Sequence, residues 1–139
     1  MIIRNIWKRV PKPLEMHKDD RGDITDIVYG EKFEYMTIVN SVPNALRGNH
    51  YHKQTHQWIL VTKGSMVYDY RDNPEDTSPT KSLEVFEGDL IYTPPLEVHA
   101  LEIGKKGCQF ITFGRGKRAG KDYESDTFRV PSIFPKDNK

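Results

Sequence analysis

Short runs of apolar and β-branched residues recur along the chain, and no window of a dozen residues keeps the 3.6-residue period of an amphipathic helix. Nine prolines and ten glycines separate these runs every few residues. Many short strands divided by turn residues are typical of an all-β sandwich or barrel. The expected strands are ITDIVY (24–29), EYMTIVNS (34–41), HQWILVT (56–62), MVYDY (66–70), SLEVF (82–86), DLIYT (89–93) and CQFITF (108–113).

Turn residues between these runs suggest how the strands connect. Lys63-Gly64 stands between HQWILVT and MVYDY, and Gly64 readily takes the positive φ of a two-residue turn, so a tight hairpin is predicted there. Glu87-Gly88-Asp89 is predicted as a second turn. The polar segment DNPEDTSPT (72–80) is predicted as a surface loop.

Length and charge narrow the class of protein. A chain of 139 residues is long enough for one domain with a buried core, which we expect over 1–130, with 131–139 as a loose C-terminal tail. The 21 basic and 20 acidic residues give a net charge of +1, which offers no argument for nucleic acid or an anionic membrane as a partner. The single cysteine, Cys108, excludes an internal disulfide and a cysteine zinc cage. With no apolar stretch of membrane-spanning length, we expect a soluble, cytoplasmic protein.

Three of the five histidines lie in one stretch, RGNHYHKQTHQWILVTKG, at 47–64. Residues two apart in a strand point to the same face, so His50 and His52 should lie side by side. Two imidazoles inside a barrel are costly unless they are hydrated, hydrogen-bonded or bound to a metal. The spacing leaves three interpretations open: a metal cage, an acid/base pair for a bound substrate, or polar residues on a solvated strand face.

A second segment, GDLIYTPPLEVHA (88–100), adds His99 in a G-x5-P-x4-H pattern. With the H-x-H pattern of the first segment, it resembles the two-part signature of the cupin superfamily. That resemblance implies a cupin (double-stranded β-helix, or jelly-roll) barrel, in which the two motifs lie on facing strands and converge on one internal pocket. Where cupins usually carry glutamate, this chain has His56 and Gln57. Alternation alone does not decide which of these two faces inward, and the resemblance favours Gln57.

A narrower resemblance links the chain to the cupins that act on sugar nucleotides. Asp20-Arg21-Gly22 and Arg47–His52 are similar to segments of the dTDP-4-dehydrorhamnose 3,5-epimerases, but the tyrosine acid of those enzymes has no clear counterpart in CQFITFG. Pro94–His99 and Tyr123–Asp126 are more similar to the dTDP-4-keto-6-deoxyhexose 3,4-ketoisomerases. RGNHYH also resembles the zinc-bearing cupin domain of capsular-polysaccharide enzymes.

The resemblance implies proton transfer next to a ketone. A 4-keto sugar is acidic at the neighbouring carbons, and removing the C3 proton gives an enediolate that can be reprotonated elsewhere or on the other face. This reaction needs a base with a pKa near neutrality, a donor to the developing oxyanion and a pocket that limits water. His50 is the expected catalytic base and His52 the second catalytic proton carrier, since unperturbed imidazole has a pKa of about 6.5. His99 is expected to polarise the ketone or to join a metal site.

The remaining candidates bind the substrate or a metal. Arg21 and Arg47 are expected to bind the diphosphate, because guanidinium groups match phosphate oxygens. Gln57 and His99 are expected to contact the sugar. The chemistry requires either no cofactor or a Zn²⁺ ion acting as a Lewis acid. If a metal is bound, its expected ligands are His50, His52, Gln57 and His99.

The sequence therefore predicts an isomerase or epimerase for a nucleotide-linked 4-keto-6-deoxy sugar, in surface-polysaccharide or glycan biosynthesis. One alternative is a metal-dependent cupin outside sugar chemistry, such as an oxygenase. Another is a non-catalytic sugar-binding barrel. The resemblance also implies a homodimer, with the apolar start MIIRNIW at the interface.

Overall fold

The computed structural model describes residues 1–117 and 120–138, and most of its regular structure is β-strand. None of the helices in these residues has the length and apolar character needed to cross a bilayer. The strands are β1 (Ile2–Asn5), β2 (Met16–Asp19), β3 (Gly22–Thr25), β4 (Tyr35–Ser41), β5 (Leu46–Tyr51), β6 (His56–Arg71), β7 (Lys81–Phe86), β8 (Asp89–Thr93), β9 (Val98–Arg115) and β10 (Phe128–Arg129), with a short helix α1 (Gly120–Ser125) and a 3-10 turn (Pro135–Asp137).

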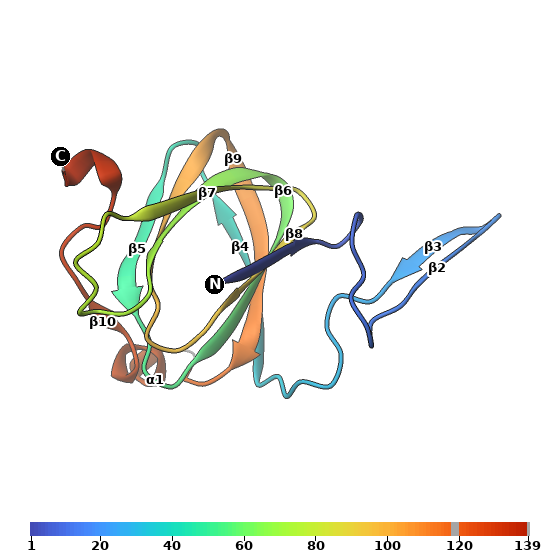
Figure 1. Cartoon of the computed structure of the whole chain (residues 1–139), viewed down its shortest axis with the longest axis horizontal. Coiled ribbons are helices and arrows are strands. Elements are labelled where there is room, and N and C mark those ends of the chain that lie inside the picture. The colour runs from blue at the N-terminus through green and yellow to red at the C-terminus, as the bar shows by residue number, and fades with distance from the viewer. Residues whose placement is uncertain (118–119, 139) are drawn as a thin grey trace.

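Two long strands, β6 and β9, run through both halves of the barrel (Figure 1). The first half of β6 pairs with β8 and with the second half of β9, and β1 and β4 complete this sheet in the order β1-β8-β6-β9-β4. The second half of β6 pairs with β7 and with the first half of β9, giving the order β7-β6-β9-β5-β10. All of these pairings are antiparallel. Two facing sheets that share bent strands form the cupin jelly-roll expected from the sequence.

The predicted hairpin at Lys63-Gly64 is wrong. β6 continues without a turn from His56 to Arg71, and its register against β9 shifts between Val61 and Lys63 and again between Gly64 and Met66. These shifts are β-bulges, which bend a strand where it passes from one sheet to the other. Gly64 does have a positive φ of 77°, and a Cβ there would lie 2.1 Å from the carbonyl oxygen of Gly107. The glycine therefore serves a close approach of two strands rather than a hairpin.

The barrel interior holds the main apolar core. Before the bulges of β6, odd-numbered residues such as Ile59 and Val61 face the interior; after them, even-numbered residues such as Met66 and Tyr68 do. The inward positions change because a bulge adds a residue to one strand and so reverses which side chains face inward. A second cluster on the outside of the first sheet is covered by residues from the N-terminal segments. This second cluster contains Ile6, Trp58, Leu60, Leu90 and Phe113, with Ile27 and Val28 packed against it.

The C-terminal segment is not the loose tail that was expected. Ile133 and Phe134 are buried against Val98 and Ala100 on the outer face of the second sheet. The hydroxyl of Thr80 donates to the carbonyl oxygen of Ile133 at 2.7 Å. Burial of two large apolar side chains fixes this segment to the barrel.

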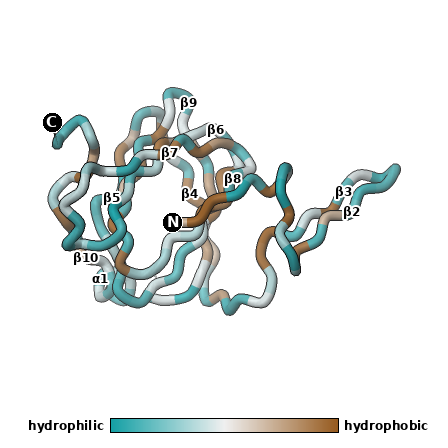
Figure 2. The backbone as a smooth tube through the Cα atoms, in the orientation of Figure 1, coloured by the Kyte–Doolittle hydropathy of each residue, from teal (hydrophilic) through white to brown (hydrophobic). Residues whose placement is uncertain are grey.

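A two-stranded arm, β2–β3, projects away from the barrel (Figure 1). Figure 2 shows that the tip of the arm is hydrophilic, whereas β1 on the barrel is apolar. Met16 and Ile24 on the arm are exposed, as are Met36 and Ile38 on the edge strand β4. In the chain by itself, these apolar side chains are left uncovered.

Candidate functional site

Three histidines from two segments of the chain meet at one end of the barrel. His50 lies on β5, His52 directly follows β5, and His99 lies at the start of β9. The ring centroids are 5.0 Å apart for His50 and His52, 4.7 Å for His50 and His99, and 5.5 Å for His52 and His99. One nitrogen atom from each ring lies within 4.8 Å of the other two. The expected convergence of the two sequence motifs is therefore present in the fold.

Gly48 allows the strands to bring these rings together. β5 pairs with β9 so that His50 is opposite His99, after a register shift between Gly48 and His50. Gly48 has a φ of 91°, and a Cβ at this position would lie 2.7 Å from the carbonyl oxygen of His99. A side chain here would push β5 away from β9 and separate the histidines.

Backbone carbonyl groups set the tautomers of the two buried histidines. The Nδ1–H of His52 donates to the carbonyl oxygen of Asp126 at 2.7 Å, and the Nδ1–H of His99 donates to that of Glu97 at 3.1 Å. A carbonyl oxygen only accepts, so Nδ1 carries the proton and Nε2 carries the lone pair in both neutral rings. This outer-shell arrangement is typical of histidines that bind a metal or accept a proton.

The environment keeps the imidazoles of His50 and His99 unprotonated. Burial lowers the pKa of His50 to about 4, with smaller contributions from the neighbouring His52 and Arg129. Burial also holds the pKa of His99 well below its usual range, and the neighbouring His50 and His52 lower it further. At neutral pH His50 and His99 therefore offer lone pairs rather than positive charges.

A cavity of about 190 Å³ lies against His50 and His99. Gln57 faces this cavity and its amide donates to the hydroxyl of Thr112 at 3.1 Å. His56 does not line the cavity, and its Nδ1 is 2.6 Å from the Tyr92 hydroxyl. Gln57 is therefore the inward residue, as the resemblance favoured. The remaining wall is largely apolar and includes Val39, Ile59, Leu101 and Phe110.

Tyr123 is a cavity residue that the motifs did not single out as a chemical group. It lies on α1, lines the cavity, and its ring centroid is 5.9 Å from that of His52. The carboxylate of Asp126, just beyond α1, accepts hydrogen bonds from the backbone N–H groups of Lys53, Gln54 and Thr55 and from the Thr55 hydroxyl. This contact ties α1 to the loop after His52. The signal in the sequence was the Tyr123–Asp126 segment itself, whose tyrosine had no assigned role.

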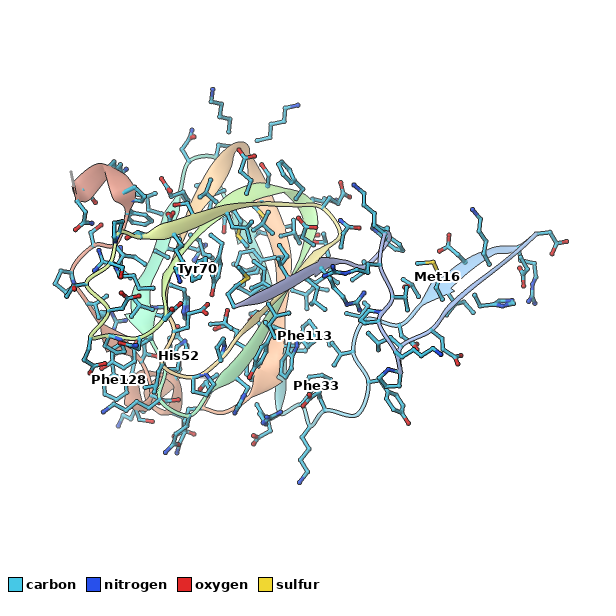
Figure 3. The ribbon with its side chains drawn as sticks, viewed as in Figure 1. Met16, Phe33, His52, Tyr70, Phe113 and Phe128 are labelled. Atoms are coloured by element: carbon cyan, nitrogen blue, oxygen red, sulfur yellow. The ribbon has the colours of Figure 1, made fainter. Side chains whose placement is uncertain are left out.

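The two predicted diphosphate arginines lie in different places. Arg47 is exposed at the wall of the cavity, and its Nε donates to the Ser41 hydroxyl at 2.8 Å. Arg21 lies on the β2–β3 arm, is 83% exposed, and pairs with Asp19 at 2.7 Å. Figure 3 places His52 near α1, on the other side of the barrel from Met16 of the arm. The fold therefore brings Arg47, but not Arg21, to the cavity of its own chain.

The donor set suits two kinds of chemistry. Three neutral imidazoles and the amide oxygen of Gln57 fit a divalent ion of borderline softness such as Zn²⁺. The same imidazoles, with the Tyr123 hydroxyl, fit proton transfer on a bound ketone. Among the described residues, none that lines the cavity is a carboxylate, so a carboxylate base is not available there.

Comparison with known proteins places these features in context. A family model described as the polysaccharide biosynthesis C-terminal domain matches residues 17–115. No curated protein sequence matches the chain at significant similarity. Among solved structures, a 3,4-ketoisomerase from Thermoanaerobacterium thermosaccharolyticum in complex with TDP has 22% identity and a TM-score of 0.64, over 84% of this chain and 83% of that one.

Two further solved structures share the fold. The capsular polysaccharide assembling protein CapF from Staphylococcus aureus has 22% identity and a TM-score of 0.63; the match covers 88% of this chain but only 34% of that protein. The dTDP-6-deoxy-D-glucose-3,5-epimerase from Legionella pneumophila has 13% identity and a TM-score of 0.65, over 84% of this chain and 69% of that one. At these identities the likeness establishes the jelly-roll fold alone.

Proposed function

The chain belongs to the polysaccharide biosynthesis C-terminal domain family, and from this premise we propose that it is an isomerase or epimerase for a nucleotide-linked 4-keto-6-deoxy sugar. The convergence of His50, His52 and His99, of which His50 and His99 line a partly apolar cavity, carries the proposal. The similar folds of a 3,4-ketoisomerase and a 3,5-epimerase agree with it. Synthesis of a surface polysaccharide or glycan is the proposed context.

His50 takes the proton from the carbon next to the ketone. Its lowered pKa keeps the imidazole neutral at pH 7, so it holds a lone pair for the C3 proton. The C–H electrons move into the C3–C4 bond, and the former ketone oxygen becomes an enediolate oxygen. Tyr123, on the same cavity wall, is placed to donate a hydrogen bond to this oxygen. The proton then passes from His50 to the lone pair on Nε2 of the neighbouring His52, and His52 returns it to the sugar. Both rings are then neutral again, and isomerisation or epimerisation is complete.

The cavity wall also suits the rest of the substrate. Ile59, Leu101 and Phe110 offer an apolar surface to the methyl group of a 6-deoxy sugar. Gln57 and Thr112 offer polar groups to the sugar hydroxyls. Arg47 is exposed at the cavity and is available to the diphosphate.

The same residues fit a bound Zn²⁺ ion. His50, His52 and His99 present ring nitrogens within 4.8 Å of one another, and Gln57 supplies an oxygen on the same cavity wall. Bound there, Zn²⁺ would act as a Lewis acid that stabilises the enediolate oxygen. In that form His50 serves as a ligand, so metal content distinguishes the two versions of the proposal.

Deuterium exchange tests the enolisation itself. We expect the protein, incubated in D₂O with dTDP- or UDP-4-keto-6-deoxyglucose, to introduce deuterium at C3, or at C3 and C5, as followed by NMR. A parallel sample treated with a chelator should exchange equally fast if the histidines act without metal, and should lose exchange if Zn²⁺ is required. Absence of deuterium at both carbons with every substrate would refute an isomerase or epimerase.

We also propose a homodimer in the cytoplasm, formed through the β2–β3 arm. Met16 and Ile24 on the arm and Met36 and Ile38 on β4 are exposed apolar side chains, and contact between two copies would cover them. The arm of one copy would then carry Arg21 toward the other copy, where the diphosphate role expected for Arg21 becomes possible.

Light scattering tests the homodimer. The unmodified chain should be dimeric at micromolar concentration, and Ile24→Asp should shift it toward monomer. Phe86→Asp changes another exposed apolar residue, on β7 and away from the arm, and should leave the mass measured by light scattering unchanged. A monomeric unmodified chain would contradict the proposal.

A further inference from the structure

The short strand β10 places a second guanidinium beside the histidine cluster. β10 pairs with β5 so that Arg129 is opposite His50 and Phe128 is opposite Tyr51. Directly opposite residues of an antiparallel pair project to the same face of a sheet. Arg129 and His50 therefore project to the same side, toward the end of the barrel where His50 lines the cavity.

Arg129 is held there by an ion pair with α1. Its Nη1 donates to Oε2 of Glu124 at 2.9 Å, and its Nη2 donates to Oε1 at 3.1 Å. Both side chains are exposed, Arg129 by 64% and Glu124 by 55%. Two parallel N–H···O bonds to one anionic group are the geometry in which a guanidinium also binds a phosphate. Glu124 directly follows Tyr123, which lines the cavity.

The charges of this pair act on the cavity. The positive charge of Arg129 lowers the pKa of His50, and the negative charge of Glu124 raises it. Both groups are therefore close enough to His50 to be felt electrostatically. On the neighbouring part of β5, Arg47 also lines the cavity, and within the described chain its Nη atoms make no hydrogen bond. Arg47 thus lines the cavity, and Arg129 lies beside His50 on the neighbouring strand.

We infer that Arg129 binds the diphosphate of the substrate together with Arg47, and that Glu124 holds the Arg129 guanidinium in place until the diphosphate displaces it. This inference rests on the proposed function, because it supplies the second diphosphate ligand that Arg21 does not provide within its own chain. An exposed ion pair is weak, so a doubly charged diphosphate displaces the single carboxylate readily. Glu124 thereby competes with the substrate.

Opposite effects of the two partners test this inference. Binding of TDP to the full chain is measured by titration calorimetry. Arg129→Ala removes charge-assisted bonds to the diphosphate and should weaken TDP binding about 10- to 100-fold, while Arg129→Lys recovers part of the loss. Glu124→Gln removes the competitor and should tighten binding about two- to fivefold. In turnover, Arg129→Ala should raise KM and leave kcat nearly unchanged.

The exposed Lys81–Asp72 pair supplies matched controls. Nζ of Lys81 lies 3.0 Å from Oδ1 of Asp72 on the surface, and neither residue lines the cavity. Lys81→Ala and Asp72→Asn make the same changes in net charge as the two test variants, and they should leave TDP binding unchanged. A purely structural Arg129–Glu124 pair predicts instead that both test variants weaken binding alike. That result, or a change no larger than in the controls, would overturn the inference.

Inorganic pyrophosphate separates this inference from the proposed function. If the unmodified chain binds pyrophosphate but neither TDP nor UDP, the nucleotide-sugar function fails, and the Arg129 and Glu124 variants still show whether this pair governs diphosphate binding. If TDP and the 4-keto sugar behave as proposed but Arg129→Ala binds both probes normally, the inference fails by itself.

Discussion

His50→Asn is expected to abolish most turnover while leaving the fold and nucleotide-sugar binding intact. Asparagine keeps polar bonding but does not accept a proton at neutral pH. The loss should be about 10²- to 10⁴-fold, the usual contribution of a positioned acid or base, which corresponds to about 3–5 kcal/mol of barrier. His50 is half-buried with one face on the cavity, so the substitution exposes no new apolar core. Turnover, TDP binding and thermal unfolding should be measured on the same preparation.

Two further variants and a metal measurement make the interpretation of His50→Asn specific. His17→Asn changes an exposed histidine on the arm and should leave turnover unchanged. His52→Asn should lose rate as well, because His52 returns the proton. If the histidines instead hold Zn²⁺, bound metal should fall in step with activity in His50→Asn, and a chelator should reproduce the defect in the unmodified protein. Full turnover by His50→Asn would show that the proton is taken elsewhere.

Most strands of the barrel were predictable from sequence, but their connection through the bulges was not. The expected strand ITDIVY (24–29) was wrong, because β3 ends at Thr25 and Ile27 and Val28 instead pack against the outer cluster. HQWILVT and MVYDY are both correct as strand segments, yet they form one strand, β6. A glycine with positive φ serves a hairpin and a bulge equally well. What decides between them is the partner: β9 runs beside the whole of β6, and Gly107 approaches Gly64 closely. This contact joins residues more than forty positions apart and leaves no local signal.

The candidate site was predictable where the spacing of residues in a strand determines which way their side chains point. His50, His52 and His99 were expected to converge, and they do. Gln57 was expected to face inward because of the resemblance, since alternation gave two equivalent answers. Arg129, which we propose as a diphosphate ligand, was not predicted, because β10 has only two residues and is too short to show a periodic pattern. Arg21 was expected to bind the diphosphate because of its motif, but its position depends on the direction in which the β2–β3 arm projects from the barrel.

Gln57→Glu is expected to convert the cavity into a stronger metal site and a poorer isomerase. The substitution adds a carboxylate to three neutral imidazoles, which gives the ligand set that cupins usually carry. At an effective dielectric of 20, two unit charges 4 Å apart interact by about 4 kcal/mol, so Zn²⁺ affinity should rise about 10²-fold or more. The same negative charge repels the developing enediolate, so metal-free turnover should fall by a similar factor.

Gln109→Glu is the matched control, because Gln109 lies on β9 outside the cavity and its amide bonds to Asn40 at 2.9 Å. It adds the same charge to the protein and should alter neither Zn²⁺ affinity nor turnover. Metal affinity is measured by competition with a chromophoric chelator, and turnover by NMR on the 4-keto sugar. If Gln57→Glu binds Zn²⁺ no better than the control, Gln57 does not face the histidine nitrogens closely enough to act with them. If it gains Zn²⁺ and also gains turnover, the reaction is metal-dependent and His50 acts as a ligand rather than as the base. A gain in Zn²⁺ with a loss of turnover is the outcome that proton transfer by His50 requires, because only then does the negative charge oppose the anion formed during the reaction.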